Sequence, residues 1–439
     1  MLLRFSSYGR ASTEPAPVNR MMAAFASGFR DGIDINLGVG YVNEKTIPVA
    51  ALTEALGAVA ADPARYRQAF NYGGADGSAN LIASLRRFLT RLRIGGLDEE
   101  TVARKRLIVG ACGATSILDA LTDVLEPGIV VASDPTYYIY RESLERKGFE
   151  VLGVPEDGEG PELAALERKL AALGGRAAGI AFFYVVTVNN PSGTMLSNAR
   201  RRALLGAATR LSRRLGRAVP VFYDLAYELL LHDPEAEPFR SVLPEDELGI
   251  AYEIGTLSKI LAPAMRMGYL IGPPGPFMEA MVQKTCDAGF SAPLFVQEMA
   301  SYLLDHCIEE QLRAVNAGYR EKAVAVGRGI ERSLGPYLAE RRGGSAGFYY
   351  YLTLADVGTH PASPFFRYLT RTTGRPEIDR QGGELRPRVI YIPGEYCVHP
   401  RGDLAEAGRR QMRISYGFEE TPRILRALEL MREAIENAG

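Results

Sequence analysis

Short runs of β-branched and aromatic residues alternate with stretches of helical periodicity along most of this 439-residue chain. Such runs are typical of buried strands, whereas apolar residues spaced three and four positions apart are typical of helices. Strands that alternate with helices form mainly parallel sheets. The pattern therefore predicts an α/β fold whose large domain contains a seven-stranded, mainly parallel sheet, with strands at residues 107–109, 129–132, 151–154, 179–186, 219–223, 252–254 and 268–271.

The pattern changes in the last third of the chain. Residues 276–304 and 311–334 have long helical periodicity, and a final helix follows strand-like runs at 347–353, 388–392 and 413–416. A short amphipathic stretch is also present near residues 21–29. Because 439 residues are too many for one simple core, we predict four parts: an N-terminal arm (1–34), a segment packing on the small domain (35–70), a large domain (71–310) and a smaller α+β C-terminal domain (311–439).

Charge and composition are those of a cytoplasmic protein that has no electrostatic reason to bind nucleic acid or a membrane surface. The 51 basic and 52 acidic side chains leave a net charge of −1. The first residues lack the apolar run of a signal peptide, and no later run reaches the roughly 18 apolar residues of a membrane span. The four cysteines and four histidines show no metal-ligand spacing. We expect no metal site.

Candidate chemistry centres on Lys259, in the stretch Gly-Thr-Leu-Ser-Lys-Ile-Leu-Ala-Pro-Ala-Met-Arg-Met-Gly. The stretch combines an amine that can form a Schiff base with the hydroxyl of Thr256 and the guanidinium of Arg266, which can hold a phosphate. An isolated lysine is ordinarily a solvated surface residue. The hypothesis depends on the order of further elements along the chain, namely Asn190-Pro-Ser-Gly, Asp224-Leu-Ala-Tyr227 and Met-Arg413-Ile-Ser-Tyr.

A glycine-rich turn offers a second phosphate-binding element. The predicted strand 107–109 is followed by Gly-Ala-Cys-Gly-Ala-Thr and then by helical periodicity. Gly113, Ala114 and Thr115 are therefore expected at a helix N-terminus, where free N–H groups and the helix dipole favour an anion. Taken alone, the turn could equally be an ordinary strand-to-helix connection.

From about residue 35 to residue 418, the order and spacing of these motifs resemble the class I/II aminotransferases, which are fold-type I pyridoxal phosphate enzymes. The similarity is greatest to the 2-aminoadipate, aromatic and kynurenine aminotransferase branch. The resemblance implies pyridoxal 5'-phosphate as the cofactor, with Lys259 as the Schiff-base lysine and proton-transfer base, and Asp224 at the ring nitrogen. It also implies a phosphate site built from Gly113, Ala114, Thr115, Thr256 and Arg266.

The same resemblance implies further site residues and a homodimer. Asn190 and Tyr227 match the pair that binds the 3-oxygen of the cofactor, and Tyr137 matches the aromatic residue that stacks on the ring, although Tyr138 and Tyr140 are neighbouring alternatives. Tyr72 matches a tyrosine that reaches the partner's phosphate across the dimer interface. Arg413 matches the clamp for the substrate α-carboxylate, to which Asn190 also contributes, and Gly40, with Gly38, matches the segment that closes over the substrate.

The implied reaction is amino transfer between an α-amino acid and a 2-oxo acid. Two departures from the family pattern leave an alternative open: Asn189 stands in place of the usual glutamine, and the stretch at 343–351 is longer than usual. The alternative is a lyase, cyclase or γ-elimination enzyme of specialised metabolism, similar to aminocyclopropane-carboxylate synthases and acting on a substrate such as S-adenosylmethionine. A remote alternative is the sensor half of a transcription regulator, which would need a DNA-binding segment before residue 35.

Overall fold

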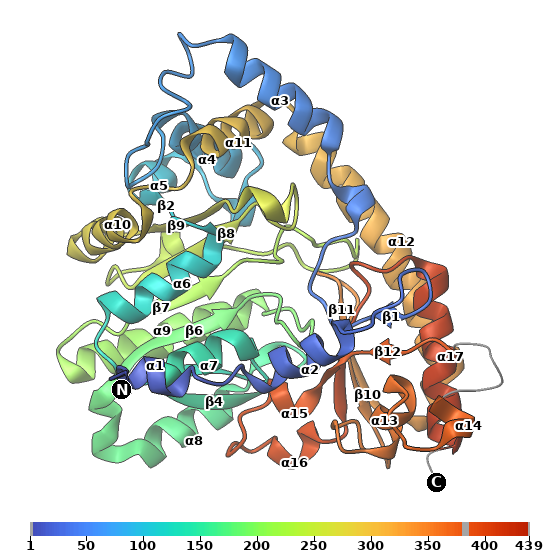
Figure 1. The fold of residues 1–439 in the computed structure, drawn as a ribbon. Coiled ribbons are helices and arrows are strands. Elements are labelled where there is room, and N and C mark those ends of the chain that lie inside the picture. The colour runs from blue at the N-terminus through green and yellow to red at the C-terminus, as the bar shows by residue number, and fades with distance from the viewer. Residues whose placement is uncertain (1–2, 380–385, 438–439) are drawn as a thin grey trace.

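A large sheet with helices on both sides runs down the left of the molecule, from β2 near the top to β4 at the lower left (Figure 1). The computed structural model describes residues 3–379 and 386–437. The strands of the sheet are β2 (Arg106–Val109), β3 (Ile129–Asp134), β4 (Glu150–Asp157), β5 (Gly160–Pro161), β6 (Ile180–Val186), β7 (Val221–Asp224), β8 (Ala251–Thr256) and β9 (Gly268–Gly272). Their spatial order is β2-β9-β8-β7-β6-β3-β4-β5.

This sheet confirms the predicted mainly parallel α/β architecture. Strands β4, β3, β6, β7 and β8 run parallel to one another, and β9 is antiparallel to both of its neighbours. All seven predicted strands form. The sheet also has a short edge strand, β5, which pairs antiparallel with β4. The sequence did not predict this strand, because the two residues Gly160-Pro161 are too few to show any alternation.

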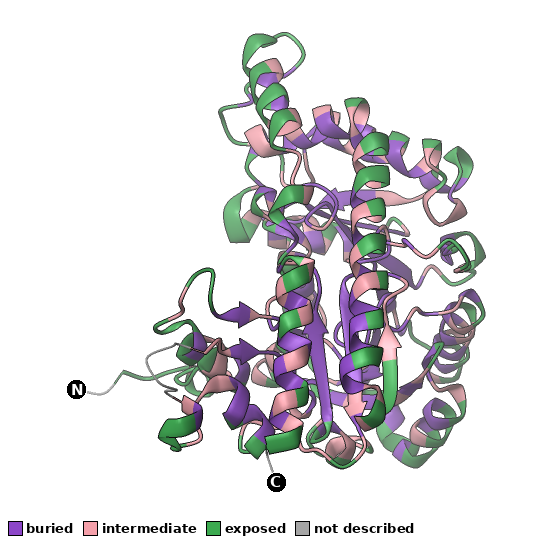
Figure 2. Ribbon diagram, turned by 90° about the vertical axis from the view of Figure 1, so that its right-hand side faces the viewer, coloured by how far each residue is buried: buried purple, intermediate pink, exposed green. Residues whose placement is uncertain are grey.

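The alternation of side chains along the strands builds two apolar cores, one on each face of the sheet. In β6, Phe182 and Tyr184 belong to one core, while Phe183 and Val185 belong to the other. Helices cover both faces, so the strands are buried and the outer sides of the helices are exposed (Figure 2). These helices are α4 (Ala79–Arg91), α5 (Glu99–Ala103), α6 (Gly113–Val124), α7 (Tyr138–Arg146), α8 (Leu163–Leu173), α9 (Asn198–Leu215), α10 (Pro276–Gly289) and α11 (Leu294–His306).

A second sheet confirms the strand-rich region and the final helix predicted near the C-terminus. Its strands are antiparallel in the order β10-β11-β14-β13, and the long helices α12 and α17 run beside it (Figure 1). The elements are α12 (Ile308–Leu334), β10 (Leu338–Gly343), β11 (Tyr349–Leu354), α13 (Pro364–Thr370), α14 (Pro376–Asp379), β12 (Val389–Ile390), β13 (Ile392–Pro393), α15 (Gly394–Cys397), α16 (Ala405–Gly408), β14 (Gln411–Ser415) and α17 (Thr421–Asn437).

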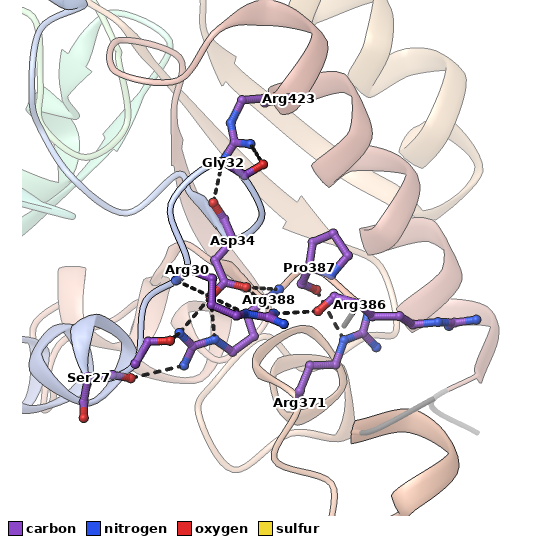
Figure 3. Close-up of polar contacts among 10 residues, drawn as sticks. Ser27, Arg30, Gly32, Asp34, Arg371, Arg386, Pro387, Arg388 and Arg423 are labelled. Atoms are coloured by element: carbon purple, nitrogen blue, oxygen red, sulfur yellow. Dashed lines mark hydrogen bonds and ion pairs between the residues drawn. The ribbon is translucent and has the colours of Figure 1, made fainter. Parts of the chain in front are cut away.

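A buried carboxylate ties the N-terminal region to the segment around β12 in the C-terminal part of the chain. The N-terminal region contains α1 (Ser7–Ala11), α2 (Pro17–Ala26), β1 (Ile35–Asn36) and α3 (Val49–Ala61), and β1 pairs in parallel with β12. Asp34 accepts hydrogen bonds from the side chains of Arg30 and Arg388 (Figure 3). Burial acts to raise the pKa of Asp34, but these hydrogen bonds outweigh it and lower the pKa to about 2.

The long helix predicted over residues 276–304 is wrong in one respect, because the structure has two helices there. Helix α10 ends at Gly289 and α11 begins at Leu294. Phe290 adopts a left-handed backbone with φ of 63°, and Pro293 lacks the N–H that a continuous helix needs. The periodicity missed this break because the connecting residues remain partly apolar. Short 3₁₀ helices occur at Glu44–Thr46, Ile94–Gly96, Gly174–Gly179, Leu243–Glu245, Pro263–Met265 and Gly335–Tyr337.

Candidate active site

A cavity lies beyond the carboxyl ends of β6 and β7. Open parallel sheets bind ligands at this edge, where the loops that follow the strands converge. The fold brings nine of the predicted residues to its wall from separate parts of the chain: Ala114, Thr115, Tyr137, Asn190, Asp224, Tyr227, Thr256, Lys259 and Arg266. Gly113, Gly40 and Arg413 lie just behind this wall, and each contacts a residue that lines the cavity.

The amine of Lys259 is buried in this wall. Its Nζ donates a hydrogen bond of 3.0 Å to the carbonyl oxygen of Gly40. Burial lowers the pKa of Lys259 to about 8, and the positive charges of Arg266 and Arg413 act in the same direction, while the carboxylate of Asp224 opposes them. A lysine with this pKa has a substantial neutral fraction near neutral pH, which is the form that attacks a carbonyl carbon.

A cradle for an anion forms where α6 begins beside β9. Gly113, the first residue of α6, has φ of +66°, and a Cβ on it would lie 3.0 Å from Nη2 of Arg266. A Cβ on Gly268 would lie 2.3 Å from the backbone nitrogen of Ala114. Both glycines therefore allow backbone and guanidinium to approach closely. The unpaired N–H groups at the start of α6, with Arg266 next to them, suit a phosphate.

Asp224 supplies a buried carboxylate at the end of β7. Its oxygens accept hydrogen bonds from the hydroxyl of Tyr184, at 2.8 Å, and from the backbone N–H of Ala226, at 3.0 Å. Burial raises the pKa of Asp224, whereas these two hydrogen bonds and Lys259 lower it. No cation forms an ion pair with it among residues 3–379 and 386–437. Such a carboxylate suits a ligand that brings a protonated ring nitrogen.

Arg413, on β14, is a buried guanidinium on the other side of Asn190. Its Nη1 donates a 2.7 Å hydrogen bond to Oδ1 of Asn190, and its Nη2 donates to the carbonyl oxygen of Gly38. Burial acts to lower the pKa of Arg413, but the phenol groups of Tyr138 and Tyr349 outweigh it, so the pKa remains above its ordinary value. Within the described part of the chain, no carboxylate pairs with this cation. The arrangement suits a carboxylate that a substrate would bring.

The structure separates the three neighbouring tyrosines that the sequence could not distinguish. Tyr137 lines the cavity. Tyr138 belongs to an apolar cluster with α2, and Tyr140 lies in the core against Tyr184, with ring centroids 4.7 Å apart. The position therefore favours Tyr137 as the ring-stacking residue.

Tyr72 is the one predicted residue that lies away from the cavity within its own chain. Its side chain is 78% exposed, and its ring packs on Phe290, with centroids 5.5 Å apart. Its predicted role concerns the partner subunit, so it stays a prediction.

A model of the family "Aminotransferase class I and II" matches residues 33–330. The chain belongs to this family. It is thus a pyridoxal phosphate-dependent aminotransferase of fold-type I, as the motifs around Lys259 predicted. This result favours amino transfer over the elimination and cyclisation reactions that the departures in sequence left open.

Two relatives show how far the similarity of this aminotransferase extends. The chain is 27% identical over 315 residues to a 2-aminoadipate transaminase of Thermus thermophilus, covering 70% of this chain and 74% of that protein. It is 26% identical over 293 residues to the uncharacterized HTH-type transcriptional regulator YisV of Bacillus subtilis. That match covers 66% of this chain and about half (52%) of the regulator.

A solved structure agrees with the aminotransferase in fold over nearly its whole length. The multiple substrate aminotransferase of Thermococcus profundus superposes with a TM-score of 0.82, covering 99% of this chain and 98% of that one. The two sequences are 22% identical. The likeness confirms the predicted fold-type I architecture.

The site of this aminotransferase fits pyridoxal phosphate in charge and in shape. Gly113 and Gly268 leave room for the cradle at the start of α6, and Asp224 is a buried carboxylate whose pKa burial raises. The amine of Lys259 shares one cavity with both features. The cradle at the start of α6 thus suits a phosphate, the carboxylate of Asp224 suits a ring nitrogen, and the amine of Lys259 suits an aldehyde carbon.

Sequence reasoning missed several residues that shape this site. Tyr184 on β6 binds Asp224, and Ser258 lines the cavity next to Lys259. Glu156 on β4 accepts a 2.8 Å hydrogen bond from Nδ2 of Asn189, the residue that replaces the usual glutamine. The even spacing of Tyr184 and Val186 along one strand could have indicated that both face the site. No local signal in the sequence connects Glu156 to Asn189, because they are 33 residues apart.

Proposed function

We propose that this aminotransferase moves the amino group of an α-amino acid to a 2-oxo acid through the named residues of the cavity. The observation that carries the proposal is the buried amine of Lys259, whose pKa is lowered to about 8, in one cavity with Asp224 and Arg266. The cofactor, when bound, supplies an aldehyde for the substrate amine and a ring that accepts the electrons released at Cα.

Cofactor binding is assigned to two ends of the cavity. Gly113, Ala114 and Thr115, with Thr256 and Arg266, would hold the phosphate through backbone N–H groups, hydroxyls and a guanidinium. At the other end Asp224 would keep a proton on the ring nitrogen, because its carboxylate is buried and has no ion-pair partner among the described residues. Tyr137 would pack on the ring face, and Asn190 and Tyr227 would donate hydrogen bonds to the 3-oxygen of the cofactor.

Substrate binding and proton transfer are assigned to Arg413 and Lys259. Arg413 binds the α-carboxylate in a bidentate pair, supported by its hydrogen bond to Asn190. Gly40 closes over the substrate and contacts Lys259. Lys259 then takes the proton from the substrate Cα, because an amine with a pKa of about 8 accepts protons near neutral pH. The substrate is an α-amino acid, and relatives that act on 2-aminoadipate favour a similar side chain.

Titration with single amino acids tests the reaction class. The visible absorption of the purified protein should bleach when its amino acid is added, and a 2-oxo acid should restore it. The Lys259→Ala variant should neither show this cycle nor turn over repeatedly. Product that accumulates without any 2-oxo acid would contradict amino transfer.

We propose a homodimer in the cytoplasm, in which Tyr72 reaches the phosphate of the partner subunit. Support comes from the exposed side chains of Phe70, Tyr72 and Phe290, of which Tyr72 and Phe290 pack on each other. Within the described residues, no helix has the length and apolar composition that a membrane crossing requires. Mixing the inactive variants Tyr72→Ala and Lys259→Ala should restore about a quarter of the parent's sites after subunit exchange, because the mixed dimer has one intact site. If Tyr72 acts in its own subunit, mixing restores nothing.

We propose that the two sheets belong to two domains, the large domain at 71–310 and the small domain at 311–439, with residues 1–34 as an arm. Residues 35–70 begin on the small domain, which the pairing of β1 with β12 supports. Spin labels at the exposed positions Arg213 and Glu340 would report domain motion as a change of distance on addition of substrate. A constant distance would argue against two moving domains.

A further inference from the structure

Tyr349 contacts two parts of the site. It is the first residue of β11 and is buried, with 1% of its surface exposed. Its hydroxyl shares a hydrogen bond of 2.8 Å with the hydroxyl of Tyr227. Its ring lies under the guanidinium of Arg413, with the guanidinium carbon 4.4 Å from the ring centroid. One side chain thus contacts both a cofactor-binding residue and the substrate-binding arginine.

The pairing of β11 with β14 fixes this position. Tyr351 lies opposite Arg413, and Tyr349 lies opposite Ser415. Side chains two residues apart on a strand point to the same face, so Tyr349 and Arg413 share one face as diagonal neighbours. Tyr350 points the other way, and its hydroxyl donates to the carbonyl oxygen of Ala323 on α12.

The segment that follows β1 also makes room for the Tyr349 hydroxyl. A Cβ on Gly40 would lie 2.7 Å from the Tyr349 oxygen, which is closer than two such atoms can pack. The carbonyl oxygen of Gly40 accepts the hydrogen bond from Lys259. The hydroxyl of Tyr349 therefore occupies the place of a side chain at residue 40, within the group of residues around the reactive lysine.

The two phenol groups have few other polar contacts. Among the described residues, the Tyr349 hydroxyl has Tyr227 as its hydrogen-bond partner. Burial raises the pKa of both tyrosines, and Arg413 counteracts this at Tyr349. Both phenols are thus neutral at physiological pH, and each can be a donor or an acceptor. When one hydroxyl donates to a second, the second becomes a stronger donor to its own acceptor.

We propose that Tyr349 is a positioning residue with two separable roles. Its hydroxyl donates to Tyr227 and so directs and strengthens the hydrogen bond that Tyr227 gives to the 3-oxygen of the cofactor. Its ring holds the guanidinium of Arg413 in the orientation that receives the substrate carboxylate. The proposal rests on the proposed function, because it assigns partners to Tyr227 and Arg413 within that site.

Two substitutions separate the roles, and a neighbour supplies the control. Tyr349→Phe removes the hydroxyl and keeps the ring, whereas Tyr349→Leu removes both. Tyr350→Phe removes the hydroxyl of another buried tyrosine, which lies on the other face of the same strand. The first readout is the pH midpoint of the visible absorption of the enzyme with bound cofactor, which does not require turnover. The second is KM against kcat for the amino acid, and thermal unfolding verifies that each variant folds.

For Tyr349→Phe we expect the midpoint to move to higher pH by about 0.5 to 1 unit. A shift of this size corresponds to the free energy of one hydrogen bond. A weaker hydrogen bond from Tyr227 leaves more negative charge on the 3-oxygen, which then holds the neighbouring proton more tightly. KM should stay within about twofold of the parent because the ring remains. For Tyr349→Leu we expect the same shift and a KM about fivefold higher, since a cation–π contact is lost. Tyr350→Phe should change neither quantity.

A midpoint in Tyr349→Phe equal to that of the parent would overturn the role of the hydroxyl. A KM in Tyr349→Leu equal to that of Tyr350→Phe would overturn the role of the ring. The Phe variant retains the packing of the ring, so it decides the first question even if the Leu variant does not fold. Failure of the proposed function would give a different result. The parent enzyme would then show no visible absorption band that depends on Lys259.

Discussion

The lowered pKa of Lys259 should be measurable as the pH dependence of cofactor capture by the apoprotein. The ordinary pKa of a lysine is 10.5, and burial followed by the charges of Arg266 and Arg413 brings it to about 8. That difference corresponds to about 3 kcal/mol against the charged amine. At pH 7 an amine with a pKa of 8 is about 9% neutral, against about 0.03% for one with a pKa of 10.5, so capture should be about 300-fold faster.

The assay removes the cofactor and follows the return of visible absorption after pyridoxal phosphate is added, from pH 6 to pH 10.5. The rate should rise with pH and level off above a midpoint near 8. Because only the neutral amine reacts, lowering the pKa moves the rise to lower pH. Nα-acetyl-lysine in the same buffers corrects for titration of pyridoxal phosphate itself, and Lys259→Ala gives the background.

A single substitution checks the cause of the shift. The carboxylate of Asp224 acts to raise the pKa of Lys259, so Asp224→Asn should move the midpoint below that of the parent. A parent midpoint at or above pH 10 would refute the reasoning, because burial would then not disfavour the charged amine. If the midpoint of Asp224→Asn were above that of the parent, the carboxylate of Asp224 would not be raising the pKa of Lys259.

Three further predictions concern substrate, cofactor and chemistry. Arg413→Met should raise KM for the amino acid about 30- to 100-fold, the worth of a charged hydrogen-bonded pair, with little change in the dissociation constant of pyridoxal phosphate; an unchanged KM would exclude Arg413 from the carboxylate site. Gly268→Ala should weaken cofactor binding at least about tenfold in a fluorescence titration, because its Cβ would lie 2.3 Å from the nitrogen of Ala114. Gly318→Ala, where the structure has open space around the glycine, should bind the cofactor normally in the same titration. Asp224→Ala should still bind cofactor and lose at least about 100-fold in kcat, and single-turnover rates equal to the parent's would contradict its role.

Most of the candidate cofactor-binding residues that line the cavity could be found from the sequence because they belong to short local patterns. Gly113, Ala114 and Thr115 follow a strand and precede a helix, and Lys259 lies within a few residues of Thr256 and Arg266. The strands were predictable for a related reason. Their buried runs leave little ambiguity when helices separate them. The family resemblance then supplied the roles, which spacing alone does not give.

The other features depend on contacts between distant parts of the chain. Glu156 binds Asn189, and Tyr349 binds Tyr227, through packing that no local pattern reveals. The break at Phe290 was missed because a left-handed backbone leaves no signature in hydrophobic periodicity. The matched family region ends at residue 330, so Arg413 and Tyr349 lie outside it.

The anchor at Asp34 makes the following residues a mechanical link between the two halves of the enzyme. Residues 34–40 begin at a carboxylate whose pKa of about 2 keeps it charged near neutral pH. They end at Gly40, which contacts Lys259, and between these points Gly38 contacts Arg413. A rotation of the second sheet would therefore move the backbone at Gly38 and Gly40 together with Arg413. The surroundings of Lys259 and of Arg413 would then change together.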